Sequence, residues 1–252
     1  MAAAGLGQSS EEGQIQRAGD RSILTINSPR PLDSAAMTLA QHFGMNVSVE
    51  DPPYIFQDDV KDVTAEVART RNPSRRVLIP KGGRLEIAFP VDLDGFPVDP
   101  QELLAKLIQQ ANAQYPFAYR LDDKDGFRAL IPTRMRDALG QAIEYTPLLD
   151  RRVTIPLGTR TIAETANLMT AALSAQTGLQ VSCCQGVVAG IPWGMATISF
   201  EAQNEPARSV LIRLIAADLQ GKPNHYYWLQ RCDPLPSKWC FINLNHATTG
   251  QR

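Results

Sequence analysis

Cysteine and histidine are the residue types in this chain best suited to bind a metal ion or to act as a nucleophile. The 252 residues include four cysteines and three histidines. The cysteines lack the paired Cys-x-x-Cys spacing of a zinc site, and no histidine lies beside an obvious nucleophile. Motifs that cradle phosphate, bind a dinucleotide or present a catalytic serine are also missing. The sequence therefore predicts no metal ion, no cofactor, no small-molecule substrate and no catalytic residue.

Two of the cysteines are spaced so that they could close a disulfide. Cys232 and Cys240 flank Asp233-Pro-Leu-Pro-Ser-Lys, which predicts a hairpin loop between two strands. A disulfide here would join the two strands at the base of the loop. Two reduced thiols on a half-buried sheet are equally compatible with this spacing, so both states stay open.

A cluster of arginines lies in the segment 51–83. Arginine binds phosphate groups through paired hydrogen bonds, so four residues are candidate anion contacts. They are Arg69, Arg71, Arg75 and Arg76. A formal net charge of −1 gives the whole molecule no field that attracts nucleic acid, so any such binding must be local. A solvated loop is the alternative interpretation of the cluster.

Apolar and aromatic residues occupy two connections that would normally be polar. Exposed apolar clusters on loops mark interaction sites, so these residues are candidates for partner binding. They are Tyr54, Ile55, Phe56, Val187, Val188 and Trp193. The alternative is that the aromatic rings fold back and cover the sheet or seal a joint.

An internal repeat determines how these residues are positioned. The segment 38–49 matches 172–183, with Leu39 on Leu173, Gly44 on Gly178 and Val47 on Val181. A second match places Leu104 on Leu211, and both pieces follow an acidic residue and a proline, which is a typical helix start. Each copy therefore predicts the order βαββαββ.

The predicted fold class is α+β, with two helices in each copy packed on small mixed sheets. Strands with period-two alternation and hairpin turns such as Asp125-Gly126 complete each unit. The predicted organisation is a disordered segment 1–21, a first module 22–133 with an insertion at 51–83, a linker 134–152, a second module 153–244 and a disordered tail 245–252.

This arrangement resembles the short N-terminal domain shared by secretins and TonB-dependent receptors (STN domain). The resemblance rests on Pro31-Leu32, Leu39-Ala40, 44–47, Asp99 and 103–107 in the first copy, and on Leu173, 178–181, 208–215 and the final hairpin in the second. Members of that family are envelope modules that make protein contacts and have no active site. The long insertion in the first copy departs from the family pattern, and no secretin pore or receptor barrel is recognised in this sequence.

The resemblance implies a non-enzymatic, periplasmic or secreted protein that acts through protein contacts or by self-association. On this hypothesis a signal peptide has been removed before residue 1, and a cytoplasmic protein is the alternative. The sequence contains no apolar run suited to span a membrane. Two other functions remain open: a nucleic-acid-binding protein that uses the arginines, and a divergent enzyme whose site lies between the copies.

Overall fold

The computed structural model describes residues 13–69, 76–124, 126–184 and 193–247, and it confirms the predicted α+β class. The first half contains β1 (Gln14–Ala18), β2 (Arg21–Ser28), α1 (Pro31–Phe43), β3 (Val47–Glu50), η1 (Gln57–Asp59), β4 (Val60–Asp62), α2 (Thr64–Ala68), β5 (Leu78–Pro80), β6 (Gly83–Pro90), α3 (Pro100–Gln114), β7 (Ala118–Lys124), β8 (Phe127–Arg136) and β9 (Ala142–Glu144). The second half contains η2 (Leu148–Asp150), β10 (Arg152–Thr161), α4 (Ile162–Thr177), β11 (Gln180–Cys183), β12 (Thr197–Pro206), α5 (Ala207–Leu219), β13 (Tyr226–Cys232) and β14 (Trp239–His246).

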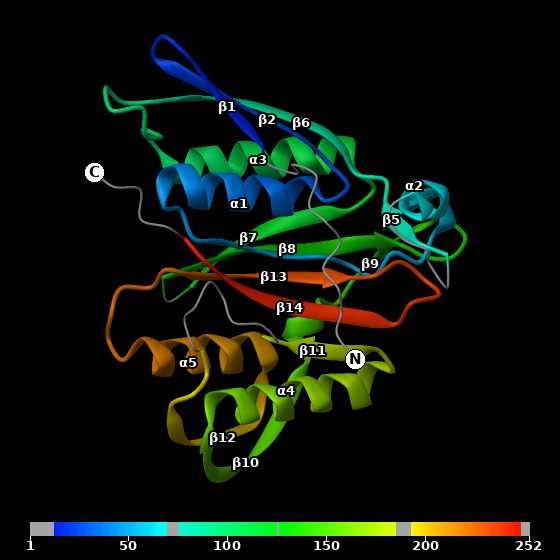
Figure 1. The fold of residues 1–252 in the computed structure, drawn as a ribbon, viewed down its shortest axis with the longest axis vertical. Helices are drawn as coiled ribbons and strands as arrows, with labels where there is room; N and C mark the ends of the chain where they lie inside the picture. The colour runs from blue at the N-terminus through cyan, green and yellow to red at the C-terminus, as the bar shows by residue number, and fades with distance from the viewer. Residues whose placement is uncertain (1–12, 70–75, 125, 185–192, 248–252) are drawn as a thin grey trace.

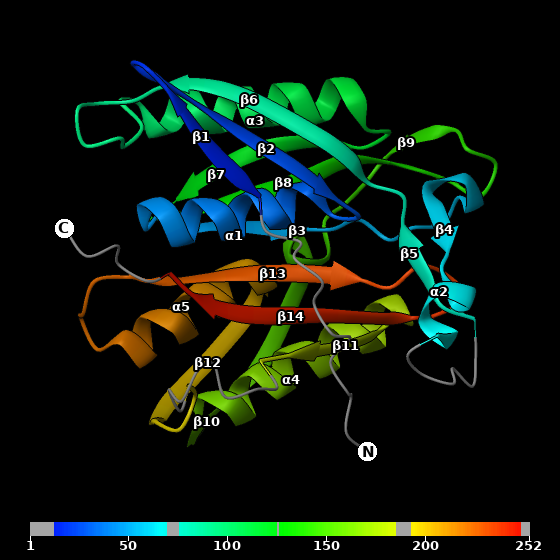
Figure 2. The ribbon, with the colours of Figure 1, turned by 45° about the horizontal axis from the view of Figure 1, so that its top comes forward.

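A seven-stranded central sheet contains strands from both halves. Its order is β11-β14-β13-β3-β8-β7, and β9 adds to β8. The halves meet where β13 pairs in parallel with β3, with Leu229 opposite Val49 and Gln230 opposite Glu50. Figure 2 shows β13 and β14 running beneath the strands of the first half. The helices of the two halves thus pack on a shared sheet rather than on separate ones.

Each face of the central sheet carries the core of a different half. In Figure 1, α1 and α3 lie on one side of the sheet and α4 and α5 on the other. Side chains alternate between the faces of a strand, so Leu229 of β13 packs into the first-half core and Trp228 into the second-half core. In β8, Leu130 and Ile131 divide in the same way. Neither half therefore completes its core without the other.

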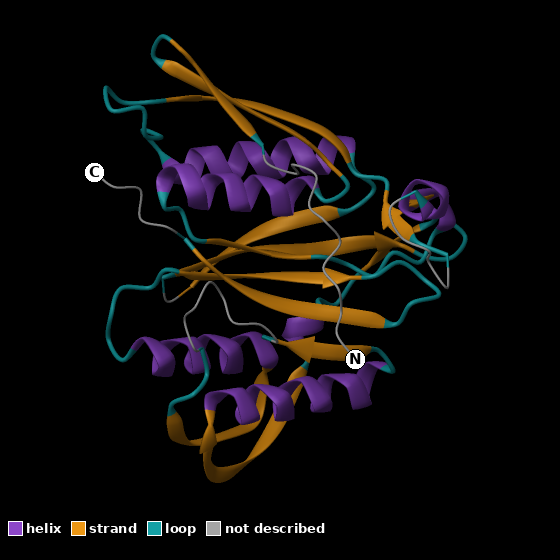
Figure 3. Cartoon of the chain, in the orientation of Figure 1, coloured by secondary structure: helices purple, strands orange, loops and turns teal. Residues whose placement is uncertain are grey.

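Two smaller antiparallel sheets cover the helices on their outer sides. The sheet β1-β2-β6 lies beyond α1 and α3, and β10-β12 lies beyond α4 and α5, so layers of strand and helix alternate through the molecule (Figure 3). In β6 the buried positions are Leu85, Ile87 and Phe89. This is the period-two alternation by which the sequence predicts its strands.

Local sequence signals set the ends of several helices. Pro31 opens α1, and Gly44 closes it with a φ of 64°, a left-handed conformation that glycine adopts without strain. The side chain of Asp99 accepts hydrogen bonds from the backbone of Gln101 and Glu102 at the start of α3, as predicted. The same kind of start was predicted for α5 with Glu205 as the cap, and this prediction was wrong. Pro206 itself is the N-cap residue, and Glu205 pairs with Arg213.

Strands also occur in the segments that were predicted as disordered ends, a linker or an insertion. Within 1–21, β1 pairs with β2. Within the expected linker 134–152, the end of β8 pairs with β9, and η2 places Leu148 in the second-half core. The insertion 51–83 contains η1, α2 and the small sheet β4-β5, while β14 extends to His246 in the expected tail. These short pieces gain order from neighbours in the fold rather than from their own propensities.

A buried ion pair holds the joint between the halves. Glu50 ends β3 with a fully buried side chain, and the side chain of Arg208, in the first turn of α5, is 8% exposed. Nε and Nη2 of Arg208 donate to the two carboxylate oxygens of Glu50 at 2.8 and 2.9 Å. Burial raises the pKa of Glu50, and hydrogen bonding from Arg208 opposes this rise. Because the two residues come from different halves, the pair fixes how the halves are aligned.

Replacing Arg208 with methionine should strongly lower the free energy of unfolding. Glu50 would stay buried and lose its counter-charge, which costs about 3 to 5 kcal/mol. Arg213→Met is a matched control on the same helix, since its pair with Glu205 is more exposed and is worth about 1 kcal/mol or less. Urea unfolding followed by far-UV circular dichroism measures both variants, and equal losses would contradict the role given to Arg208.

Candidate functional site: a cavity beside the joint

A cavity of about 210 Å³ lies in the first half, next to the joint. Its walls come from the start of α1, the segment after β3, the end of β5, the α3–β7 connection and the end of β8. The acidic residues that line it are Asp33, Asp51, Asp58 and Asp59, and the basic ones are Arg30, Lys81 and Arg136. Tyr54, Tyr115, Phe117 and Tyr119 supply the aromatic wall. Charged and aromatic groups therefore converge on one small space.

An ion pair within the first half and two contacts that cross between the halves form one side of this cavity. Nε of Arg30 donates to Oδ2 of Asp51 at 2.7 Å, and its Nη2 donates to the backbone oxygen of Cys232 at 2.9 Å. Nε of Arg231, in β13, donates to Oδ2 of Asp33 at 2.6 Å. The second half thus supplies a cation and a carbonyl group to a cavity that lies in the first half.

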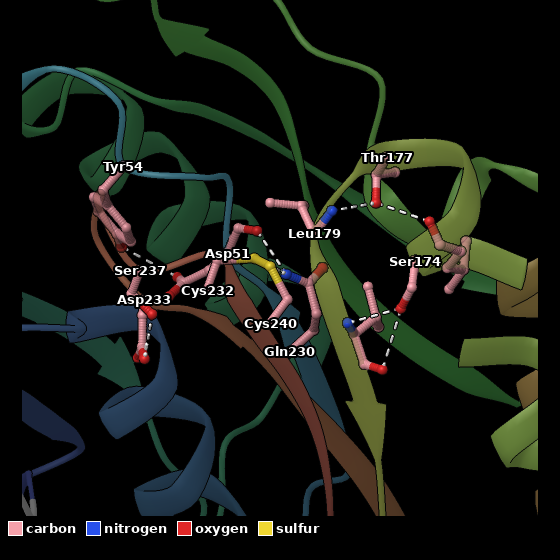
Figure 4. Close-up of a disulfide and its surroundings, with 12 residues drawn as sticks. Asp51, Tyr54, Ser174, Thr177, Leu179, Gln230, Cys232, Asp233, Ser237 and Cys240 are labelled. Carbon is pink, nitrogen blue, oxygen red and sulfur yellow. Dashed lines mark hydrogen bonds between the residues drawn. A yellow bond between two sulfur atoms is a disulfide. The ribbon is translucent and has the colours of Figure 1, made fainter. Parts of the chain in front are cut away.

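The backbone around Asp51 is held as firmly as its side chain. The Asp51 amide donates to the backbone oxygen of Gln230 at 2.8 Å, and Nε2 of Gln230 donates to the Asp51 carbonyl at 2.8 Å. Figure 4 shows this contact beside the pair formed by Cys232 and Cys240. The Tyr54 hydroxyl lies 3.3 Å from Oδ1 of Asp51. Asp51 therefore connects the joint to the aromatic wall of the cavity.

Burial dominates the electrostatics of Asp51. Loss of hydration raises the pKa of its carboxyl group to about 7, while the charge of Arg30 opposes the rise and the charge of Asp33 adds to it. Arg231 also favours the ionised form. The carboxyl group therefore titrates near neutral pH in the folded protein.

A second ion pair also lines the cavity. Nη1 of Arg136, in β8, donates to Oδ1 of Asp59 at 3.2 Å, and its guanidinium lies 5.5 Å from the ring centroid of Phe56. Burial raises the pKa of Asp59, and Arg136 and Lys81 oppose the rise. This pair connects the insertion to the central sheet.

The structure separates the residues that the sequence proposed for partner binding. Tyr54 lies in the cavity wall, Ile55 packs against the first-half core, and Phe56 contacts Arg136. Trp193 is buried in the second-half core, which is the alternative that the sequence left open. Val187 and Val188 lie outside the described residues. The two aromatic connections therefore do not form one surface through Tyr54 and Trp193.

The arginine cluster is only partly described. Nε of Arg76 donates to Oδ2 of Asp62 at 2.8 Å, and Arg69 is exposed at the end of α2. Arg71 and Arg75 lie outside the described residues. The predicted anion site is therefore not seen as a unit, and one of its members already has an acidic partner.

The cysteines form two pairs at bonding distance. Sγ of Cys232 lies 2.04 Å from Sγ of Cys240, across the β13–β14 hairpin that the sequence predicted. Cys183 and Cys184, adjacent at the end of β11, form a second pair that the sequence did not suggest.

Across the described ranges, no group of three His, Cys, Asp or Glu residues could hold a metal ion. In the same part of the chain no helix has both the length and the apolar character to cross a membrane.

The sequence missed the acidic residues of the cavity. Asp33 has the features of an ordinary acid in the first turn of a helix, and Asp51 those of a turn residue after a strand. The only available signal was that Arg30 and Asp33 flank Pro31-Leu32 at a predicted helix start.

No family model, curated protein or solved structure matches this chain. The resemblance to the STN domain therefore stays a sequence-based prediction.

The stability of the protein should depend on pH through Asp51. The folded state holds the Asp51 proton up to about pH 7, whereas the unfolded chain releases it near pH 4. The folded state thus binds more protons in this window, so stability falls as the pH rises from about 4 to about 7. Urea unfolding at several pH values should show a loss of about 1 to 3 kcal/mol, of which Asp51→Asn removes a part. Burial also raises the pKa of Glu50, so Glu50 changes the stability in the same direction and should account for the pH dependence that remains in the variant. An unchanged pH profile in the variant would contradict this assignment.

Proposed function

We propose that this chain is a non-enzymatic protein-interaction module of the cell envelope, and that a partner protein inserts a side chain into the cavity beside the joint. The observation that carries the proposal is the size and lining of this cavity. At about 210 Å³ it is smaller than the roughly 300 to 1,000 Å³ of sites for drug-sized ligands. It has room for one anchor side chain, and buried anchors in preformed pockets dominate protein interfaces.

The rigidity of the site supports this proposal. Arg30 is held by Asp51 and by the Cys232 carbonyl of the other half, and Arg231 pairs with Asp33 across the joint. Residues at the mouth are exposed, namely Asp58, Lys81 and Gln114. A preorganised site with an open mouth loses little entropy when a partner binds.

We further infer that the two halves are copies of one βαββαββ unit, of the kind that the STN resemblance implies. One observation supports the duplication, and a second supports the location in the envelope. In the first half β8 pairs in parallel with β3 and antiparallel with β7, and in the second half β14 pairs in the same way with β11 and β13. The two cysteine pairs at bonding distance favour an oxidising compartment such as the periplasm.

Self-association through the sheet edges receives less support than partner binding in the cavity. Strands β7 and β11 lie at the ends of the central sheet and correspond in the repeat to β13 and β3. The β13–β3 joint is therefore a template for adding a second copy of the chain through β7 and β11. However, the repeat matches Glu50 to Cys184 and Arg208 to Gln101. A second copy added in the same way would lack the ion pair that holds the internal joint.

An enzyme that uses the same cavity is the second candidate function. It is favoured by the pKa of Asp51 near 7, since perturbed carboxyl groups gather at catalytic sites. However, both oxygens of Asp51 already have partners, in Arg30 and Tyr54. This arrangement favours a structural role for Asp51.

A tryptophan at the mouth of the cavity should block partner binding. Gln114 is the last residue of α3, is exposed and lines the cavity, so Gln114→Trp should fill the mouth without disturbing the core. Gln109→Trp is the matched control, because Gln109 is exposed on the same helix and does not line the cavity.

The measurement is chemical crosslinking of each immobilised variant to a membrane-envelope extract, followed by quantitative mass spectrometry. The crosslinking yield of a partner should fall about tenfold with Gln114→Trp and stay unchanged with Gln109→Trp. Equal yields from both variants would remove the cavity as the contact site.

A further inference from the structure

Two residues that line the cavity each have a buried carboxylate oxygen without a hydrogen-bond partner among the described residues. These oxygens are Oδ1 of Asp33 and Oδ2 of Asp59. Asp33 is 1% exposed and Asp59 is 8% exposed. A buried polar atom without a partner costs free energy, so such atoms in a native structure call for an explanation. A ligand that donates hydrogen bonds would supply one.

Three guanidinium nitrogens of the two arginines that line the cavity already donate to other groups. Nε and Nη2 of Arg30 donate to Asp51 and to the Cys232 carbonyl, and Nη1 of Arg136 donates to Asp59. No buried donor that lines the cavity lacks a partner in the part of the chain that the structure describes. The spare hydrogen-bonding capacity of the buried lining is therefore that of an acceptor, which suits a group that donates only.

The charged and aromatic side chains that line the cavity narrow the chemical class of the ligand further. Four acidic and three basic side chains line the cavity. Both arginines are paired with carboxylates, and Lys81 is exposed at the mouth. Tyr54, Tyr115, Phe117 and Tyr119 also line the cavity, and aromatic rings attract cations, as the Arg30 guanidinium 5.9 Å from the Tyr54 ring centroid illustrates. Guanidinium and ammonium groups donate hydrogen bonds and accept none.

We propose that the cavity binds a guanidinium or ammonium group on an alkyl stem, as in an arginine or lysine side chain of the partner. The polypeptide source of this group rests on the proposed function, whereas its chemical class rests on the cavity alone. The cation would donate to Oδ1 of Asp33 and Oδ2 of Asp59, and its stem would pack against the aromatic wall.

The chemical class is tested with propylguanidinium and with propylurea, a neutral molecule of nearly the same shape. Isothermal titration of the whole protein should show that propylguanidinium binds at least about tenfold more tightly than propylurea. Asp59→Asn should weaken propylguanidinium binding by about tenfold, while Asp123→Asn, at an exposed carboxylate of β7 outside the cavity, should leave it unchanged. Equal binding of the two probes, or equal binding by both variants, would overturn the proposal.

A second variant guards against misfolding of Asp59→Asn. Asp58 is exposed at the mouth, so Asp58→Lys changes the charge there without touching a buried ion pair. It should also weaken propylguanidinium binding and leave the melting temperature near that of the parent protein. Unchanged affinity in a folded Asp58→Lys variant would count against the cation.

A peptide distinguishes the source of the cation. Acetyl-Gly-Gly-Arg-Gly-Gly-amide should bind at least as tightly as propylguanidinium, and the same peptide with glutamine in place of arginine should not bind. Binding of propylguanidinium without binding of the arginine peptide would overturn the polypeptide source and point to a free organic cation. Crosslinking yields that are insensitive to Gln114→Trp would instead overturn the proposed function, even if propylguanidinium binds.

Discussion

The parallel pairing of β3 with β13 is the constraint on which the rest of this structure depends. It merges the strands of both halves into one sheet, and each face of that sheet receives the helices of one half. Only two residue pairs form the parallel contact, so side chains must secure it. The Glu50–Arg208 pair does so at the end of β3. A buried ion pair adds little net stability, but its loss is costly because one charge then stays buried alone. The pair therefore acts mainly on the alignment of the halves.

The cavity is a consequence of the same joint. Arg30 reaches across to the Cys232 carbonyl, and Arg231 reaches back to Asp33, so these two contacts exist only when β13 lies beside β3. The charged groups there are costly to bury, and they are tolerated because nearly every one has a partner of opposite charge. Asp33 and Asp59 have such partners too, but the second oxygen of each has no donor among the described residues. A folded joint thus leaves a preorganised acceptor site beside it.

The halves share a pattern of elements and differ in chemistry. Leu39 and Leu173 are both fully buried, and Gly44 and Gly178 both end a helix in a left-handed conformation. Core positions and helix ends thus follow the repeat. By contrast, Glu50 matches Cys184, which belongs to the adjacent cysteine pair of β11. The polar groups of the cavity therefore belong to the first half and to the edge of the second half that meets it.

The sequence by itself determined the class of the fold, most helix and strand positions and the hairpins, because capping residues, glycine stops and apolar periodicity act over a few neighbouring residues. It predicted the hairpin that β13 and β14 form, and it placed Tyr54 among the candidate contacts. Only the tertiary structure decided that β13 pairs with β3. Gln230 and Asp51 are 179 positions apart, and backbone pairing between distant strands leaves no local pattern in the sequence. For the same reason the sequence did not reveal the cavity. Asp33, Asp51 and Asp59 resemble ordinary surface acids until long-range packing buries them together.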